Sequence, residues 1–229
     1  ATDPLYTRAG DFALDSQGYL VNGSGYYLNG WVVDPTTGSV AKNASQPIQV
    51  TQLKDNPQQT TSISLSANLP TQPDTSLDTN TATAAVDMPA QAVTIYDAQG
   101  TPHVVELNWS WDSANPDTWS LNVTSTDATV TSPLTLNTTT SPVPVQFNTA
   151  NDTLTGAQAG SIAAIDGTTG TIGTDAGITF DVAYANGNTQ TITLGFGRYG
   201  VAQQLTNFTG TDIDLNSATQ DGLPPGSFR

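Results

Sequence analysis

A few residues in this chain have types and spacings that could support chemistry, and the first group resembles a metal site. The segment "DIDLN" (residues 212–216) matches the D-x-D-x-N opening of a calcium-binding loop. The match then fails, because Ser217 stands where the loop needs a sharply turning glycine and Leu223 where it needs a bidentate glutamate. Ile213 and Leu215 alternate with the acids, which predicts a half-buried strand with a solvated outer face.

His103 is the single histidine, and the chain has no cysteine. One histidine cannot build a transition-metal cluster, and no nucleophile elbow accompanies it. We predict a solvated or capping role for it in the turn "GTPH". The acids are nineteen aspartates and Glu106, spread so evenly that no pair suited to glycoside hydrolysis stands out. The residues therefore predict no enzyme, with no catalytic, cofactor-binding or metal-binding site.

Three tryptophans leave two interpretations open. Trp109 and Trp111 lie two residues apart, on one face of a predicted strand, and Trp119 lies on the predicted partner strand. Such a row could stack against sugar rings, as in secreted carbohydrate-binding modules. It could equally fill the interior of a β-sandwich, since large aromatic side chains bury the most area per residue. We favour the interior and keep the sugar platform as the alternative.

The charge is strongly acidic, with five Lys and Arg against twenty Asp and Glu and a formal net charge of -15. A surface of this sign repels phosphate backbones and anionic headgroups, so we expect neither nucleic-acid nor membrane binding. No apolar run approaches the ~18 residues of a membrane span. The start at Ala1 lacks a methionine and a basic–apolar leader, which we interpret as an internal or processed fragment.

The composition predicts an all-β fold. Strong helix formers are scarce, whereas threonine, glycine (20) and proline (14) are frequent. Threonine crowds a helix at its branched Cβ and suits a pleated strand. At 229 residues the chain can form one large β domain or two smaller ones.

The stretch "YTRAGDFALDSQGYLVNGSGYYLNGW" (residues 6–31) reads as hairpins. The turns "DSQG" and "NGSG" separate strands expected near 12–14, 19–21 and 26–33. We expect its aromatic residues to pack as cross-strand partners. These are Tyr6, Phe12, Tyr19, Tyr26, Tyr27 and Trp31.

Alternation and turn residues predict further short strands, forming a sandwich or barrel in two lobes. A long connection after Trp31 should end in a strand at 48–52, "DAQG" (97–100) should turn a strong hairpin, and "ANGN" (185–188) should make a two-residue turn. The tail from Val201 should be irregular. The other expected strands are 61–69, the pair around 93–95 and 105–109, 118–124, 143–148, 160–164, 178–184 and 189–196.

Residues 6–31 also resemble the segment shared by bacterial flagellar axial proteins, Y-[TS]-R-x-G-x-F, then L-D, G-x-L-V-N-x-x-G and L-x-G-[WY]. The later stretches "SANLP", "TIYDAQGTPHVVELNW" with "DTWSL", "VQFNTANDTLTG" and "GVAQQLTNFTG…QDGLPPGSFR" follow the order of the hook-protein family. The chain is thus similar to hook proteins over nearly its whole length. The structural positions that the resemblance marks are Tyr6, Arg8, Gly10, Phe12, Leu14, Asp15, Gly18, Leu20, Val21, Asn22, Gly25, Leu28, Gly30, Trp31, Tyr96, Asp97, Gly100, His103, Trp119, Gly222 and Gly226.

The resemblance implies two β-rich domains. It predicts an inner domain of residues 1–64 plus 205–229, discontinuous and truncated on its C-terminal side, and an outer domain of residues 65–204 inserted into it. It also implies a structural subunit of the flagellar hook, the flexible helical tube that acts as a universal joint and transmits torque from rod to filament.

The partners implied are further copies of the chain, rod and hook–filament junction proteins and a hook cap. The localisation implied is extracellular, after export by the flagellar apparatus without a cleaved signal peptide. The family's terminal helical segments are missing here, so we expect poor polymerisation of this chain alone. The alternatives are a distal-rod-type axial protein, the carbohydrate-binding module and a surface adhesin. The sequence shows no internal repeat of the kind expected for an adhesin array.

Overall fold

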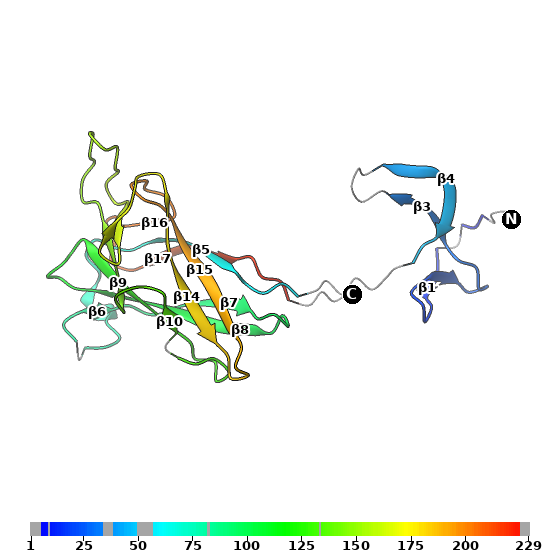
Figure 1. The fold of residues 1–229 in the computed structure, drawn as a ribbon, viewed down its shortest axis with the longest axis horizontal. Coiled ribbons are helices and arrows are strands. Elements are labelled where there is room, and N and C mark those ends of the chain that lie inside the picture. Colours follow the sequence, from blue (N-terminus) through cyan, green and yellow to red (C-terminus); the bar gives the residue numbers. More distant parts are fainter. Residues whose placement is uncertain are drawn as a thin grey trace. The chain divides into compact units, whose positions relative to one another are not determined.

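The computed structural model describes residues 6–8, 10–33, 39–49, 57–81, 83–132 and 134–224. The chain divides into two compact units, Ala1–Asn56 with Gly226–Arg229 and Pro57–Pro225, and each is described separately below. Across the described segments every regular element is a strand, apart from the short 3₁₀ turn η1 (Thr75–Leu77) (Figure 1). The prediction of an all-β chain is confirmed. None of the helices described is long and apolar enough to cross a membrane.

The first unit consists of two antiparallel strand pairs. One pair joins β1 (Phe12–Leu14) to β2 (Leu20–Asn22), and the other joins β3 (Asn29–Val33) to β4 (Val40–Pro47). The three strands predicted within the opening stretch are therefore present. The prediction after them was wrong, because β4 occupies the expected connection. The strand expected at 48–52 reduces to one bridge from Gln49 to Tyr19, and residues 50–52 lie outside the described part.

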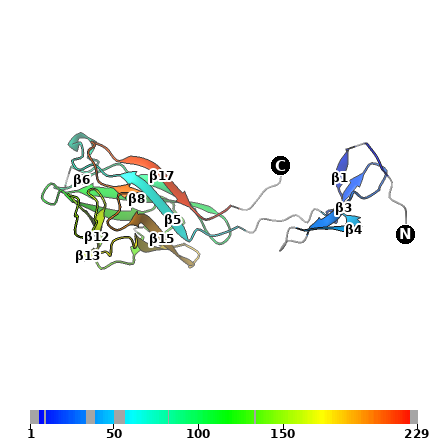
Figure 2. The same ribbon diagram turned by 90° about the horizontal axis from the view of Figure 1, so that it is seen from above.

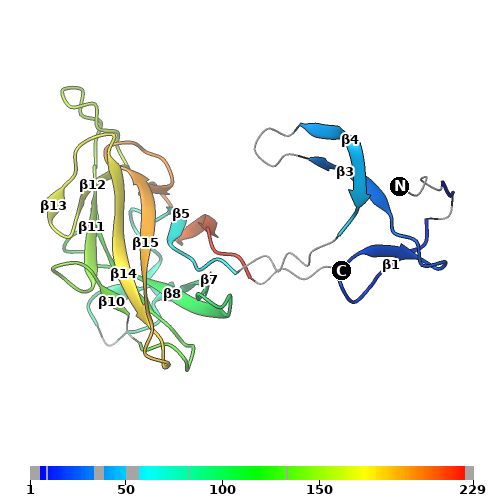
Figure 3. The same ribbon diagram turned by 45° about the vertical axis from the view of Figure 1, so that its right-hand side comes forward.

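In the second unit, β5 holds the first of two large sheets together. β15 pairs with its first half and β16 with its last two residues, both in parallel, and β17 runs antiparallel along it. Figure 3 shows the long β14–β15 hairpin that continues this sheet towards β10. The strands are β5 (Ser62–Asn68), β10 (Thr135–Leu136), β14 (Asp175–Ala183), β15 (Thr189–Arg198), β16 (Leu205–Thr206) and β17 (Asp214–Gln220).

The second sheet has the order β13-β12-β11-β9-β8-β6, and β7 also pairs with β8. All of these pairings are antiparallel, including the predicted hairpin of β7 and β8 around the "DAQG" turn. The strands are β6 (Val86–Asp87), β7 (Gln91–Tyr96), β8 (Pro102–Trp111), β9 (Thr118–Thr124), β11 (Val143–Phe147), β12 (Ile162–Ile165) and β13 (Thr168–Thr169).

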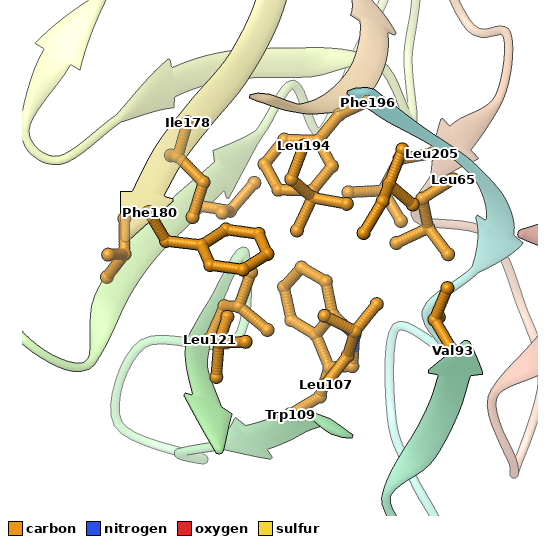
Figure 4. Packing of buried hydrophobic residues seen from close by; sticks show 14 of the residues in the cluster. Leu65, Val93, Leu107, Trp109, Leu121, Ile178, Phe180, Leu194, Phe196 and Leu205 are labelled. Carbon is orange, nitrogen blue, oxygen red and sulfur yellow. The ribbon is translucent and has the colours of Figure 1, made fainter. Parts of the chain in front are cut away.

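The core lies between these two sheets. Alternate residues of β8 and β9 point inward from one sheet and alternate residues of β14 and β15 from the other, as expected for a sandwich. Figure 4 shows Leu107, Trp109 and Leu121 facing Phe180 and Phe196 across the interior. All five side chains are essentially buried, and the rings of Trp109 and Phe196 lie 6.1 Å apart. The predicted sandwich is present in this unit.

The unit boundaries differ from the predicted ones near residues 64 and 205. The second unit begins at Pro57, and β16 and β17 belong to it, because both pair with β5. Figure 2 shows β5 (cyan) and β17 (red) side by side. The irregular tail expected after Val201 therefore contains two strands of the sandwich. The predicted return of the chain to the first domain concerns residues from 225 onward, which lie outside the described part.

Candidate assembly surface and the polar end of the sandwich

Two turns of one design shape the opening stretch. Asp15 Oδ1 accepts hydrogen bonds from the backbone N–H groups two and four residues later, at 2.8 and 2.9 Å. Asn22 Oδ1 does the same, at 3.0 Å for both. Gly18 and Gly25 follow with φ of 83° and 81°, a region that glycine enters without a Cβ penalty. The side chain at the start of each turn adds two hydrogen bonds to the backbone bonds that close it, which gives these four signature positions a structural role.

The aromatic residues of this stretch are largely exposed. The exposed fractions are 93% for Tyr6, 58% for Tyr26, 47% for Tyr27 and 57% for Trp31. Only the edge-to-face contact of Tyr19 with Tyr27, at 5.3 Å, has the expected cross-strand character. None of the first unit's residues with a described burial is buried. The expectation that the aromatics pack between strands was wrong, because two small strand pairs supply no opposing layer.

A recess lies beside these exposed rings. It has a volume of about 440 Å³, and Tyr19, Trp31 and Ile48 are among its lining residues. Gly30 forms part of its wall, and a Cβ at that position would lie 2.9 Å from Ile48 Cδ1. The glycine therefore lets Ile48 lie against β3. A recess of mixed polar and apolar lining, bordered by the exposed Trp31, can receive side chains from another polypeptide segment.

Backbone hydrogen bonds tie the two strand pairs of the first unit together. Leu28 N–H donates to Leu20 at 2.8 Å, Leu20 N–H donates to Ile48 at 3.2 Å, and Ile48 N–H donates to Leu28 at 2.7 Å. Val21 adds a bridge to Tyr27. The remaining signature residues lie in or before β1: Arg8, Gly10 and Leu14 are exposed, and Phe12 is half-buried.

The signature positions of the second unit are mostly buried or in turns. Asp97 Oδ1 accepts from the N–H groups two and four residues later, at 2.9 and 2.8 Å, and Gly100 follows with φ of 77°. This is a third turn of the same design, directly after the half-buried Tyr96. Trp119 is fully buried and donates from Nε1 to the Pro70 carbonyl at 3.2 Å. Gly222 is buried, and Gly226 lies outside the described residues.

His103 is buried, which corrects the expected solvated or capping role. It is 6% exposed, because it occupies an inward-facing position of β8, in phase with Val105. Its Nδ1 lies 2.7 Å from Asp127 Oδ2, and its Nε2 lies 3.5 Å from Asp97 Oδ2. Nε2 has no hydrogen-bond partner within this geometry. The ring lies against Tyr184 in a tilted arrangement, with centroids 4.7 Å apart and an interplanar angle of 45°.

The two acids and the phenol respond to these surroundings. Hydrogen bonds from Thr129 and then from His103 lower the pKa of Asp127 to about 2. Burial, followed by the charges of Asp97 and Asp127, raises the pKa of Tyr184 to about 12. The carboxylates thus stay ionised and the phenol stays neutral near pH 7. The exposed Thr129 hydroxyl joins this cluster: it donates to Asp127 Oδ1 at 2.7 Å and lies 3.2 Å from His103 Nδ1, so it ties the acid to the ring.

Tyr184 extends the cluster along the end of the sandwich. Its hydroxyl donates to Gln190 Oε1 at 2.6 Å, and Gln190 Nε2 donates to the carbonyls of Thr60 and Tyr96. Like His103, Tyr184 and Gln190 continue the inward-facing phase of their strands. Sequence reasoning missed both residues, although that phase was the available signal.

The other sequence candidates do not form sites. Trp109 is 1% exposed and Trp111 is 6% exposed, so their indoles fill the core and offer no platform to a sugar. Asp212 Oδ1 accepts from the next backbone N–H, and Asp214 lies exposed at the start of β17. Over the described part of the chain, no group of three or more His, Asp or Glu residues is arranged so that it could hold a metal ion.

Family models account for both units. The "Flagellar basal body protein FlaE D2 domain" matches residues 64–223, and the "Flagellar hook protein FlgE/F/G D1 domain" matches residues 1–68. Relatives named "Flagellar hook protein FlgE" include one from Rhizobium meliloti, 33% identical over 174 residues, which are 68% of this chain and 39% of that protein. Another, from Caulobacter vibrioides, is 39% identical over 75 residues, 30% of this chain and 13% of the relative.

A solved structure is also similar, the Helicobacter pylori flagellar hook protein FlgE2. It is 14% identical, with a TM-score of 0.48, over 97% of this chain and 75% of that one. The chain spans well under half the length of the curated relatives named above.

The described chain is all-β, with a well-packed sandwich and a smaller unit that exposes several aromatic side chains. The family model for residues 64–223 covers more than half of the chain. The chain belongs to the flagellar hook protein family.

Proposed function

We propose that this chain is a structural subunit of the bacterial flagellar hook, joining further copies of itself in a helical tube. Identical subunits that meet head to tail without closure generate such a filament. In this proposal the first unit supplies adhesive surface, and the sandwich supplies a rigid outer body. The proposal includes no catalytic activity.

The observation that carries the proposal is the contrast in burial between the two units. The sandwich encloses a core of aromatic and aliphatic side chains, whereas the first unit exposes half or more of Tyr6, Tyr26 and Trp31. Two-stranded sheets are marginally stable alone in water. Contact with further polypeptide would cover these rings and stabilise the unit, as subunit packing in a polymer does.

Association can be tested by sedimentation velocity on this chain and on a version extended to the length of its relatives. We expect long polymers from the extended protein. The double variant Tyr26→Ser/Trp31→Ser in the extended protein should reduce polymer mass at least several-fold, because it removes the exposed rings. Monomeric behaviour of the unsubstituted extended protein under all conditions would overturn the proposal.

Two exposed apolar residues of the sandwich provide the matched control. Leu154 is 96% exposed and Phe208 is 45% exposed. The variant Leu154→Ser/Phe208→Ser removes similar apolar area from the other unit, and we expect it to leave more polymer than the Tyr26/Trp31 variant. An equal loss of polymer mass in the two double variants would contradict the special role of the first unit.

The same proposal implies particular partner proteins and a location relative to the cell. We infer that rod, hook–filament junction and cap proteins contact this chain at the ends of the tube, outside the cell. Export by the flagellar apparatus without a cleaved signal peptide belongs to the same inference, as does the return of residues beyond 225 to the first domain. Cell fractionation and imaging of a tagged chain in a flagellated host would test the location.

A distal-rod-type role is the runner-up. The D1 model that matches residues 1–68 is described for FlgE, FlgF and FlgG together, so the first unit does not favour either role. The large sandwich of residues 57–224 supports the hook, since the resemblance attributes the long middle insertion to hook proteins. Complementation of separate rod and hook deletions would distinguish the two.

A further inference from the structure

The two ends of the sandwich unit leave it side by side. Gln58 and Leu223 form an antiparallel bridge in which each N–H donates to the other's carbonyl, at 3.0 and 2.8 Å. Beyond this bridge, β5 and β17 pair along residues 63–68 and 214–220. Both chain connections of the unit therefore start from one end of a single strand ladder (Figure 2). Pulling the two connections apart would unzip this ladder one pair at a time.

Asp221 holds the open end of the ladder together. Its Oδ1 accepts from the backbone N–H groups of Thr61 at 2.8 Å and Ser62 at 2.9 Å. Its Oδ2 accepts from the Thr61 hydroxyl at 2.5 Å, and its own N–H donates to the Ser62 carbonyl at 3.3 Å. One side chain thus accepts hydrogen bonds from two successive backbone donors at the start of β5. Burial alone would raise the pKa of Asp221, but these hydrogen bonds outweigh it and lower the pKa to about 2.

Thr60 closes the inner side of the same junction. It is fully buried; its hydroxyl donates to Gln220 Oε1 at 2.9 Å and accepts from the Tyr96 N–H at 2.9 Å. Gly222 N–H donates to the same Gln220 oxygen. A Cβ on Gly222 would lie 2.4 Å from Thr60 Oγ1 and 2.9 Å from Thr60 N. Only glycine lets the departing chain pass this close, which accounts for a signature position with no side chain.

The geometry points to a clamp, formed by Thr60, Thr61, Gln220, Asp221 and Gly222, that locks the two chain connections of the sandwich unit against unzipping. Its use in carrying torque between the domains rests on the proposed hook function. The local locking does not, since it concerns one folded unit. Asp221 is the positioning residue at its centre, because it binds the entering strand from the leaving one.

Hydrogen–deuterium exchange of the full chain tests the clamp directly. Asp221→Asn keeps the shape of the side chain but replaces one acceptor oxygen with a donor. We expect amide exchange at Thr61 and Ser62 to accelerate by about tenfold or more, because these amides lose a charged acceptor. Exchange in β8 and β15, in the middle of the sandwich, should stay unchanged. If the amides of Thr61 and Ser62 exchange no faster in Asp221→Asn than in the unsubstituted chain, the clamp is overturned.

Two further variants keep the result interpretable. Asp214→Asn removes the same charge from an exposed position on β17, the strand that precedes Asp221, and we expect it to leave exchange at Thr61 unchanged. Thr61→Val removes only the hydroxyl donor to Asp221 and should accelerate exchange less than Asp221→Asn. If Asp221→Asn unfolds the whole unit, Thr61→Val still has to accelerate exchange at the junction, and no acceleration there would reject the proposal.

Force spectroscopy addresses the mechanical role. Handles placed just before Pro57 and just after Pro225 load the ladder from its open end. We expect Asp221→Asn to lower the first rupture force relative to the unsubstituted chain and to Asp214→Asn. Unchanged rupture force together with accelerated exchange would reject the mechanical role alone. Failure of the extended protein to polymerise would reject the hook function and leave the clamp standing.

Discussion

Single polar residues close one end of the sandwich interior. His103, Tyr184 and Gln190 continue the inward phase of their strands at the points where the apolar residues run out. A buried polar group is costly unless it is hydrogen-bonded, so each of them needs partners. Gln190 and Tyr184 satisfy each other and the backbone, and His103 depends on Asp127 and Asp97. This end of the core should therefore respond to pH.

The pH response can be worked out for Asp127. Its pKa is lowered from 3.8 to about 2 in the folded protein, so the ionised form is stabilised by folding. This stabilisation is fully present above about pH 4 and is lost as the pH falls towards 2. We predict that Asp127→Asn destabilises the sandwich by about 1 kcal/mol at pH 7. The difference from the unsubstituted chain should shrink in urea titrations repeated from pH 5 to pH 2.

The matched control is Asp175→Asn, which removes an acid that lies in an exposed pair with Arg198, at 3.6 Å. Exposed ion pairs contribute little to folding stability. This variant should therefore match the unsubstituted chain in its unfolding free energy at pH 7 and in the loss of that free energy at low pH. A pH-independent deficit in Asp127→Asn would contradict an electrostatic role for Asp127.

The tryptophans give a second prediction at this scale. Trp119 is fully buried and donates to the Pro70 carbonyl, whereas Trp31 is 57% exposed in the other unit. Trp119→Ala should cost about 3–5 kcal/mol of unfolding free energy, through the cavity and the unsatisfied carbonyl. Trp31→Ala should change the unfolding free energy of the sandwich by less than about 0.5 kcal/mol. Equilibrium urea unfolding followed by circular dichroism measures both, and similar losses would refute the assignment.

At the scale of strands, the β14–β15 hairpin contains a bulge between Ala176 and Gly177. A Cβ on Gly177 would lie 2.4 Å from the Leu194 carbonyl oxygen, whereas a Cβ on Gly195 would meet nothing closer than 3.7 Å. We predict that Gly177→Ala destabilises the sandwich by about 1–3 kcal/mol, because the backbone of a paired strand must move. Gly195→Ala should be nearly neutral. Thermal unfolding of the two variants compares them, and equal midpoints would contradict the geometry.

Local signals predicted much of the strand pattern. The turns that begin at Asp15, Asn22 and Asp97 were expected from their Asx residue and following glycine, and each has that geometry. Alternation likewise predicted the buried faces of β5 and β8. The "ANGN" prediction was too short: Gly187 N–H donates to the Tyr184 carbonyl, and Tyr184 N–H donates to the Asn188 carbonyl, which makes a longer loop.

Features that depend on distant pairing were not predicted. β4 is held by its ladder with β3 and shows no apolar alternation in its sequence "VAKNASQP". β17 joins β5 across about 150 residues, and no local pattern encodes that pairing. The exposure of Tyr26 and Trp31 was also not predicted, because whether a second layer covers a hairpin depends on segments far away in the sequence. Position in the strand phase would have placed His103 in the interior.

At the scale of the whole molecule, charge is divided unevenly between the units. Fifteen of the twenty acidic residues and only one of the five basic residues, Arg198, fall within Pro57–Pro225. The remaining residues are nearly neutral and include the exposed aromatic rings of the first unit. Association through the first unit is thus opposed by repulsion between the sandwiches of neighbouring copies.

Salt should therefore promote assembly of the extended protein. Screening acts over about 8 Å at physiological ionic strength, so added salt weakens repulsion between sandwich surfaces while apolar contacts of the first unit persist. We predict that polymer mass, followed by light scattering, rises several-fold between about 10 and 150 mM NaCl. Replacing three exposed sandwich acids, Asp175, Asp212 and Asp214, with asparagine should lower the salt concentration needed for assembly. Replacing Asp11, in the near-neutral unit, should change the salt concentration needed for assembly very little. Scattering that is independent of salt in all of these proteins would show that repulsion between the acidic sandwiches does not limit assembly.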